Sequence, residues 1–275
     1  MSIIQDTFLL NDGHKIPKLG FGTWQIPNGP VCFEASTAAL KAGYRHIDSA
    51  RGYDNEESVG EAMRKSGLKR DEIYLTTKLP ADIKSYQEAL DSFEYSMAQF
   101  GEGIDYVDLY LIHAPWSWSG PYVSNHEGNL EAWRAMVELQ KAGRINSIGV
   151  SNFSVEDLQN ILDNSDVKPA VNQIRWFVGN TQDEITNFCK ENDILVEAYS
   201  PLATGKLLED PKIHEIAAKH GRTIPQIAIR YCLEKGVLPL PKSTHEEYII
   251  ANADLDFELT TDDLLFLDKL DYTDI

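Results

Sequence analysis

Four polar side chains stand at positions that suggest proton transfer. Asp48, Lys78 and His113 each end one of three successive apolar runs, and Tyr53 follows Asp48 by five residues. If these runs are neighbouring parallel strands, their polar ends meet on one face, and the short loop can fold the phenol back over them. The sequence therefore predicts a phenol, an ammonium, a carboxylate and an imidazole in one cleft.

Such a set is suited to protonating an oxyanion as it develops at a carbonyl. A free tyrosine has a pKa near ~10, which is too high for efficient proton transfer at neutral pH. We expect a buried Lys78 ammonium to lower the pKa of Tyr53, and Asp48 to offset the desolvation of that ammonium. The imidazole would then orient the carbonyl oxygen. A lone lysine–aspartate pair or a lone histidine is often structural, but their conjunction at matching strand ends favours catalysis.

The elements that position these residues alternate regularly between short β-branched or aromatic runs and amphipathic helical patterns. Ser154 and Thr181 are candidate N-caps of two of the helices. Eight strands alternating with helices indicate a (β/α)8 TIM barrel, here as a single domain over residues 1–275. The eight runs are Lys18–Gly22, His46–Ala50, Ile73–Leu79, Tyr106–His113, Ile145–Ser151, Ala170–Arg175, Ile194–Ser200 and Val237–Lys242.

A doubly wound sheet is the competing architecture, and it would usually carry a glycine-rich turn after its first strand. Residues 20–22 (Gly-Phe-Gly) begin such a motif, but Gln25 occupies the third glycine position, so we interpret these glycines as sites of close backbone packing in a barrel. Residues 11–13 (Asn-Asp-Gly) predict an N-terminal β-hairpin that closes the barrel bottom. His46 should point inward one layer below Asp48 and belong to the core.

Composition narrows the function classes. The 275 residues carry a formal net charge of −18, which argues against nucleic acid and anionic membranes as partners. No signal-peptide pattern is present, and no apolar run approaches the ~20 residues that span a bilayer. Cys32, Cys189 and Cys232 are too scattered for a disulfide framework or a CxxC pair, and no histidines show metal-ligand spacing. We therefore expect a cytoplasmic protein without a metal. The sequence does not determine the oligomeric state, and we expect a monomer.

Several segments along nearly the whole chain resemble those of the aldo-keto reductases. Residues 43–60 (GYRHIDSARGYDNEESVG) are similar to the first signature of that family, and residues 108–115 (DLYLIHAP) to its fourth-strand segment. Further matches follow in the family order: GVSNF at 149–153, NQ at 172–173, AYSPLA at 198–203 and PKS at 241–243. The chain resembles a prokaryotic-type member with a short C-terminal loop, which predicts an open site.

This resemblance implies reduction of the carbonyl group of a small molecule by NADPH, with NADH as an alternative cofactor. Asp48, Tyr53, Lys78 and His113 match the catalytic tetrad, with Tyr53 as the acid in reduction and the base in the reverse direction. The cofactor contacts implied by the matched motifs are Ser151, Asn152, Gln173, Tyr199, Ser200, Leu202, Lys206, Lys242, Ser243, Tyr248 and Asn252. Ser151, Asn152 and Gln173 match residues that hold the nicotinamide carboxamide. Tyr199 matches the ring on which nicotinamide stacks.

The sequence departs from the family pattern near the substrate mouth. Ala114 replaces a frequent tryptophan, and residues 175–178 (Arg-Trp-Phe-Val) stand where Tyr-His-Pro is usual, so the substrate range is in doubt more than the chemistry. Trp24, Trp116 and Trp176 are expected to line the pocket, and such rings favour apolar carbonyl substrates. Trp118 and Tyr122 fit either a pocket wall or a small core within their own loop.

Residues 241–252 (PKSTHEEYIIAN) match the segment that grips the adenosine end of the cofactor, but with one contact missing. Lys242 and Ser243 match contacts to the ribose 2′-phosphate, whereas Tyr248 replaces an arginine whose planar fork binds that phosphate. Glu246 and Glu247 either face the phosphate or face solvent at a helix start, where the macrodipole favours them. We predict that the chain binds NADPH with weakened discrimination against NADH.

Two functions of other kinds stay open. A Schiff-base aldolase would use Lys78 as its nucleophile, because barrels do host such lysines. A non-catalytic cofactor-binding module of the same fold would need no tetrad. Asp48 argues against the aldolase because it should keep Lys78 charged, and the intact tetrad argues against the binding module.

Overall fold

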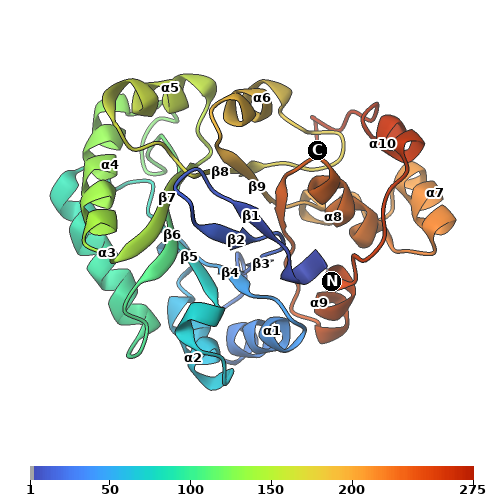
Figure 1. The fold of residues 1–275 in the computed structure, drawn as a ribbon, viewed down its shortest axis with the longest axis horizontal. Helices are drawn as coiled ribbons and strands as arrows, with labels where there is room; N and C mark the ends of the chain where they lie inside the picture. Colours follow the sequence, from blue (N-terminus) through green and yellow to red (C-terminus); the bar gives the residue numbers. More distant parts are fainter. Residues whose placement is uncertain (1–2) are drawn as a thin grey trace.

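The structure, a computed structural model, describes residues 3–275. Eight parallel strands hydrogen-bond in chain order, and helices surround them (Figure 1). Gly20 donates to the Pro239 carbonyl at 3.2 Å and Gly22 to the Pro241 carbonyl at 3.0 Å, which connects the first strand to the last. The predicted TIM barrel is confirmed. Its strands are β3 (Phe21–Gly22), β4 (His46–Asp48), β5 (Tyr74–Leu79), β6 (Val107–Ile112), β7 (Ile145–Ser151), β8 (Val171–Arg175), β9 (Leu195–Tyr199) and β10 (Leu238–Leu240).

The helices begin largely where the sequence indicates. Ser154 caps its helix in a capping box with Asp157, as predicted. The Thr181 prediction is wrong by one position, because Gln182 is the N-cap and the Thr181 hydroxyl donates to the Asp183 carboxylate instead. The α-helices are α1 (Pro30–Lys41), α2 (Glu56–Lys65), α3 (Tyr86–Phe100), α4 (His126–Lys141), α5 (Val155–Asn164), α6 (Asp183–Glu191), α7 (Pro211–His220), α8 (Ile224–Glu234), α9 (Glu246–Ala253) and α10 (Thr261–Leu267). The 3-10 turns are η1 (Ile3–Gln5), η2 (Arg51–Tyr53), η3 (Arg70–Glu72) and η4 (Ala203–Gly205).

The glycines before and within β3 allow close packing, as the sequence suggested. A Cβ atom at Gly20 would lie 2.4 Å from the Leu240 side chain and 2.6 Å from Nδ1 of His46. One at Gly22 would lie 3.2 Å from the Leu240 carbonyl oxygen. A side chain at Gly20 would have to displace the side chains of Leu240 and His46, and one at Gly22 would press on the backbone of β10, so the absence of Cβ lets the first and last strands pack closely.

The N-terminal hairpin closes one end of the barrel, as predicted. β1 (Thr7–Leu9) pairs antiparallel with β2 (Lys15–Pro17), and the pair lies across the barrel opening in Figure 1. Ile16 is buried in a cluster with the barrel residues Leu109 and Leu238. Asn11 donates to the carbonyl of Pro169, just before β8, so the hairpin covers the amino-terminal ends of the strands. The opposite end is left for chemistry.

The main core lies between the strands and the helices around them. His46 is fully buried inside the barrel, one layer below Asp48, and its Nε2 lies 2.9 Å from the Thr76 hydroxyl, as expected for a core residue. The three cysteines are buried and unpaired, and burial raises the pKa of Cys32 and Cys189 to about 11. Within residues 3–275, no helix has the length and apolar character needed to cross a membrane.

Candidate active site

The carboxyl ends of three neighbouring strands bring the predicted tetrad together. β4 ends at Asp48, Lys78 is the penultimate residue of β5, and His113 directly follows β6. Tyr53 ends η2, the turn that follows β4, and this turn brings the phenol hydroxyl to 3.2 Å from Nζ of Lys78. The parallel register of the barrel thus converts widely spaced residues into one cluster.

The Lys78 ammonium is the centre of this cluster, and its side chain is 0% exposed. Its Nζ lies 2.7 and 2.8 Å from the two carboxylate oxygens of Asp48, 2.9 Å from the Ser49 carbonyl and 3.2 Å from the Tyr53 hydroxyl. Burial lowers the pKa of Lys78, but the attraction of Asp48 and Tyr53 outweighs it, so the net shift is upward. The lysine is therefore charged at neutral pH and has Asp48 as its counter-ion.

The pKa of Tyr53 is shifted in the direction opposite to the sequence-based expectation. Desolvation raises it to about 12; Lys78 lowers it as expected, but too little to compensate, and the charge of Asp48 adds to the rise. The expectation counted the ammonium and left out desolvation. The hydroxyl consequently keeps its proton throughout the neutral range, so the proton is present for donation, but in the protein without cofactor the group is a weaker acid than free tyrosine.

The His113 imidazole is neutral. Burial and the nearby Lys78 charge hold the pKa of His113 well below its usual range. Its ring lies edge-on to Tyr53 and to Trp118, with ring centroids 5.5 and 4.6 Å away. Its Nδ1 is enclosed and has no hydrogen-bond partner among residues 3–275, whereas Nε2 is not enclosed. A neutral imidazole of this kind can donate a hydrogen bond to a ligand in the cleft.

A hydrogen-bonded set of side chains forms the next part of the site, at the ends of β7, β8 and β9. The Tyr199 hydroxyl donates to Asn152 at 2.8 Å, and the Asn152 amide donates to the Ser151 hydroxyl at 3.1 Å and to the His113 carbonyl at 3.0 Å. Ser151 in turn donates to the backbone carbonyl of Gln173 at 2.8 Å. Asn152 has a φ of +61°, a strained conformation that asparagine tolerates better than most residues. The network fixes these side chains relative to the tetrad.

One cleft of about 680 Å³ connects the tetrad with most of the predicted cofactor contacts. Lys78 lies beneath its floor, because it is fully buried. The predicted site residues that line the cleft are Trp24, Asp48, Tyr53, His113, Trp116, Ser151, Asn152, Gln173, Tyr199, Ser200, Leu202 and Lys242. Lys206, Ser243, Tyr248 and Asn252 do not line it.

The aromatic wall of the cleft includes Trp24, Trp116, Trp118 and Tyr122, and Tyr122 also packs against Trp116 of its own loop, with ring centroids 6.2 Å apart. Trp116, Trp118 and Tyr122 lie in the loop that follows β6. Asp82 anchors this loop by accepting hydrogen bonds from the Ser119 backbone and side chain, both at 2.8 Å.

The prediction for Trp176 is wrong. Its side chain is 1% exposed and stacks on Tyr231, with ring centroids 5.6 Å apart, so it packs in the core behind β8. Trp176 directly follows β8, and its packing against Tyr231 decides that it faces away from the cleft.

The predicted adenosine segment lies beside one end of the cleft. Lys242 is exposed there, and Tyr248 on α9 is 57% exposed, with its ring 5.4 Å from that of His245. Glu246 and Glu247 are exposed in the first turn of α9, the solvent-facing alternative, where the helix dipole favours negative charge. Asn252 is buried at the end of the same helix.

Sequence reasoning missed several residues of the site. Glu197 lies in the middle of β9, fully buried, and contacts Gln173. A charged residue inside an otherwise apolar run was the signal in the sequence that could have indicated Glu197 as a site residue. The lining residues that were not predicted as part of the site include Gln25, Gly52, Pro201, Thr204, Gly205 and Leu208. Ser200 and Thr204 have φ values of +52° and +57°, and such backbone strain clusters at functional loops.

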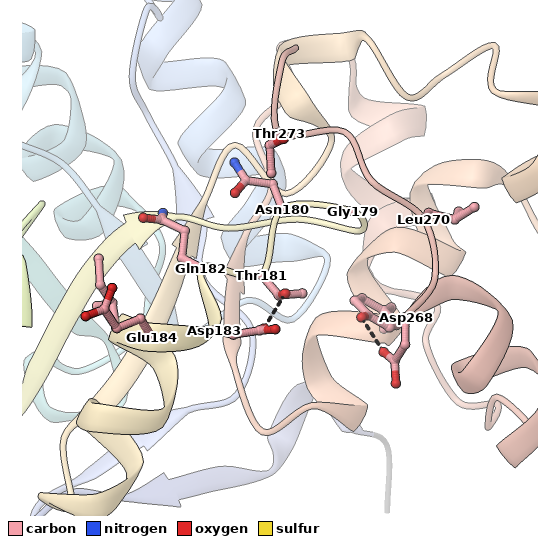
Figure 2. Close-up of a pocket in the computed structure, with 11 residues that line it drawn as sticks. Gly179, Asn180, Thr181, Gln182, Asp183, Glu184, Asp268, Leu270 and Thr273 are labelled. Carbon is pink, nitrogen blue, oxygen red and sulfur yellow. Dashed lines mark hydrogen bonds between the residues drawn. The ribbon is translucent and has the colours of Figure 1, made fainter.

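A second hollow of about 470 Å³ lies away from the tetrad, between the start of α6 and the C-terminal segment (Figure 2). Its lining includes Asp183, Glu184 and Asp268. Two of these carboxylates already accept hydrogen bonds, from Thr181 at 2.6 Å and from Tyr231 at 2.6 Å. No group of three potential metal ligands occurs in the part of the chain that the structure describes. The first cleft is therefore the candidate active site.

Comparison with known proteins assigns the chain to a family. The glyoxal reductase of Bacillus subtilis (strain 168) is 40% identical over 269 residues, which cover 98% of this chain and 92% of that protein. A crystal structure of an aldo/keto reductase from Brucella melitensis has a TM-score of 0.90 at 44% identity, covering 97% of this chain and 99% of that one. An aldo-keto reductase from Bombyx mori, solved in complex with NADP, has a TM-score of 0.87 at 33% identity, covering 96% and 92%.

The sequence profile of one family also matches almost the whole barrel, from residue 18 to residue 271. The matched range contains every member of the tetrad and the whole cleft lining. The chain belongs to the aldo/keto reductase family of oxidoreductases.

Proposed function

We propose that the protein reduces aldehyde and ketone carbonyls to alcohols with NADPH, reversibly, and that Tyr53 donates the proton. The observation that carries this proposal is the Lys78 ammonium, which is held on Asp48 and lies 3.2 Å from the Tyr53 hydroxyl at the floor of an open cleft. When a carbonyl oxygen becomes an alkoxide it needs a proton donor, and the ammonium stabilises the donor after it has lost its proton.

The cleft fits a nicotinamide cofactor by the chemistry of its donors and acceptors. Ser151, Asn152 and Gln173 offer hydroxyl and amide groups for a carboxamide, and the Tyr199 ring offers a flat surface for stacking. Leu202 lies in the loop expected along the pyrophosphate, and Lys242 supplies a cation at the expected phosphate end. When bound, the cofactor supplies the hydride. The complex of the Bombyx mori relative with NADP supports this choice.

The chain's own residues would act on the carbonyl oxygen. The Tyr53 hydroxyl gives its proton to that oxygen, and the Lys78 ammonium stabilises the phenolate that remains. Asp48 keeps the ammonium charged and in place. The neutral His113 donates a hydrogen bond to the same oxygen and orients it toward Tyr53. In the reverse direction, the phenolate accepts the proton of the alcohol.

The lining supports neutral carbonyl compounds with apolar or aromatic substituents as substrates. Trp24, Trp116 and Trp118 form an apolar wall, and Lys242 is the one lysine or arginine of the lining among the described residues. It lies at the expected cofactor end, and the Lys78 ammonium beneath the floor is already paired with Asp48, so a substrate carboxylate would find no free cation beside the tetrad. The name of the glyoxal reductase relative is consistent with a small carbonyl compound.

The Schiff-base alternative is disfavoured by the state of Lys78. A nucleophilic amine needs a free lone pair, whereas this ammonium is charged, fully buried and bonded to Asp48, Ser49 and Tyr53. Borohydride should therefore trap no substrate adduct on Lys78. A trapped adduct formed without nicotinamide would replace the reductase proposal by the aldolase.

The proposed function is tested by following the oxidation of NADPH and of NADH with a panel of aldehydes, ketones and dicarbonyl compounds. We expect loss of reduced nicotinamide matched by alcohol formation, fastest with neutral and aromatic carbonyls. NADPH binding without turnover of any member of the panel would favour the non-catalytic module instead.

The cofactor preference should be weak, and Tyr248→Arg should strengthen it. The arginine adds a planar fork for the 2′-phosphate, and we expect it to raise NADPH affinity by ~1 kcal/mol or more, about fivefold, with little change for NADH. Titration of protein fluorescence with each cofactor measures both constants. Tyr248→Phe is the control, because it keeps the ring and adds no charge. A wild-type preference for NADPH above about a thousandfold (~4 kcal/mol) would contradict the prediction.

A further inference from the structure

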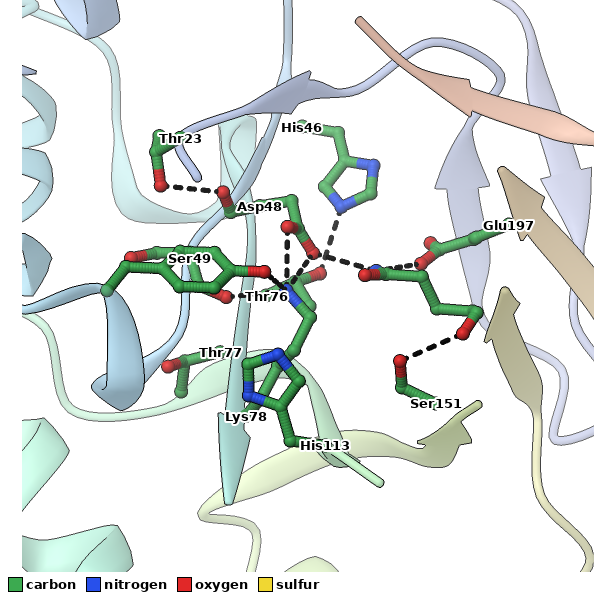
Figure 3. Close-up of polar contacts among 12 residues, drawn as sticks. Thr23, His46, Asp48, Ser49, Thr76, Thr77, Lys78, His113, Ser151 and Glu197 are labelled. Carbon is green, nitrogen blue, oxygen red and sulfur yellow. Dashed lines mark hydrogen bonds and ion pairs between the residues drawn. The ribbon is translucent and has the colours of Figure 1, made fainter. Parts of the chain in front are cut away.

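Glu197 is a buried acid that the proposed chemistry does not use. It lies in β9 directly opposite Gln173 of β8, and its side chain points into the barrel interior beneath the cleft (Figure 3). It is 0% exposed, yet no lysine or arginine pairs with it among residues 3–275. A buried carboxyl group without a counter-ion is costly, so its retention in the site requires a physical reason.

The contacts of Gln173 supply that reason. Its amide nitrogen donates to Oδ2 of Asp48 at 2.9 Å and to Oε2 of Glu197 at 2.8 Å. Both amide hydrogens are thereby used inside the barrel. The carbonyl oxygen of the same amide has no partner among the described residues, and Gln173 lines the cleft. Rotating the amide by half a turn would place this oxygen against the Asp48 carboxylate, which can only accept hydrogen bonds, so the observed orientation is favoured.

The protonation state of Glu197 is compatible with this contact. Burial raises the pKa of Glu197 to about 8, and the charge of Asp48 acts in the same direction. The group is therefore mostly neutral at pH 7, and its carbonyl-type oxygen still accepts from Gln173. A neutral acid also avoids a second buried anion that would compete with Asp48 for Lys78.

We propose that Glu197 is a positioning residue: together with Asp48 it locks the Gln173 amide so that only its carbonyl oxygen faces the cleft. A fixed acceptor recognises a ligand that donates an N–H group, as the carboxamide of nicotinamide does. The inference rests on the proposed function as far as the ligand is concerned, whereas the locked amide is a property of the protein alone.

The lock is tested with Glu197→Leu, which removes the acceptor, and Glu197→Gln, which keeps one. Val196→Ala is the matched control, since Val196 is buried in the same strand and points to the opposite face. In the protein without cofactor, hydrogen exchange of the Gln173 side-chain amide is followed by NMR. We expect protection in the wild type, in Glu197→Gln and in Val196→Ala, and about tenfold or faster exchange in Glu197→Leu, as for loss of one buried hydrogen bond.

Calorimetric titration measures the effect on the ligand. The probes are NADP⁺, its 3-acetylpyridine analogue, which lacks the N–H₂ group, and adenosine 2′,5′-bisphosphate. Glu197→Leu should weaken NADP⁺ about 5- to 30-fold and leave the bisphosphate within about twofold, so that discrimination against the acetylpyridine analogue falls. Glu197→Gln should restore it.

Unchanged discrimination in a folded Glu197→Leu protein would overturn the proposal, and so would equal weakening of NADP⁺ and the bisphosphate. If the wild type showed a protected amide but no affinity for NADP⁺, the proposed function would fail while the lock itself stood.

Discussion

Tyr53→Phe should remove nearly all reduction of an activated aldehyde while leaving NADPH affinity unchanged. The substitution deletes one oxygen atom, the one that lies 3.2 Å from the Lys78 ammonium and that we assign as the proton donor. General acid catalysis contributes about 10²- to 10⁴-fold to a rate, so a fall in kcat of this size is expected. The ring remains in place beside His113, so the shape of the cleft is kept.

The measurement is the initial rate of NADPH oxidation, together with the dissociation constant of NADPH from fluorescence titration. Tyr86→Phe is the control, since its hydroxyl donates a hydrogen bond to Glu138 on the outer surface of the barrel. Turnover in Tyr53→Phe close to that of the wild type would rule out the assigned role. A loss of cofactor affinity as large as the loss of rate would assign Tyr53 to binding.

The positions of the tetrad were predictable because a barrel imposes them. Asp48, Lys78 and His113 each lie at or near the end of an apolar run. Neighbouring parallel strands place such ends side by side, independently of the length and sequence of the loops between them. The hairpin and the N-cap at Ser154 were predictable for a different reason, because each has a local sequence motif. These features depend on local chemistry or on strand periodicity, and both are written in short stretches of the chain.

The features that were not predictable depend on competition between interactions of similar size. The direction of the Tyr53 pKa shift depends on whether desolvation or the Lys78 charge is larger, which needs the burial of a three-dimensional site. Trp176 follows a strand directly, but packing against Tyr231 decides that it turns inward. The partnership of Gln173 with Glu197 joins two strands through a side-chain contact, and its only sequence signal is an acid within an apolar run.

The buried pair at the centre of the site should separate stability from catalysis. Lys78→Met would leave the Asp48 carboxylate buried without its counter-ion, with the Gln173 amide as its remaining side-chain donor. Breaking a buried ion pair in this way costs about 3–5 kcal/mol, and we expect a loss of that order in the free energy of unfolding. The rate of reduction should also fall at least as far as in Tyr53→Phe, because no cation remains beside the phenol.

The double variant Lys78→Met/Asp48→Asn removes both charges. It should recover much of the lost stability, since two neutral side chains of similar size need no counter-ion, yet it should stay inactive. Urea denaturation and the NADPH oxidation assay measure the two properties separately. The exposed pair Lys65–Glu61, at 2.6 Å, is the control, and the matching changes there should alter stability by less than about 1 kcal/mol. A double variant as unstable as Lys78→Met would mean that the lysine acts mainly through packing. Recovered turnover would mean that proton donation by Tyr53 needs no ammonium, and the role assigned to Lys78 would fall.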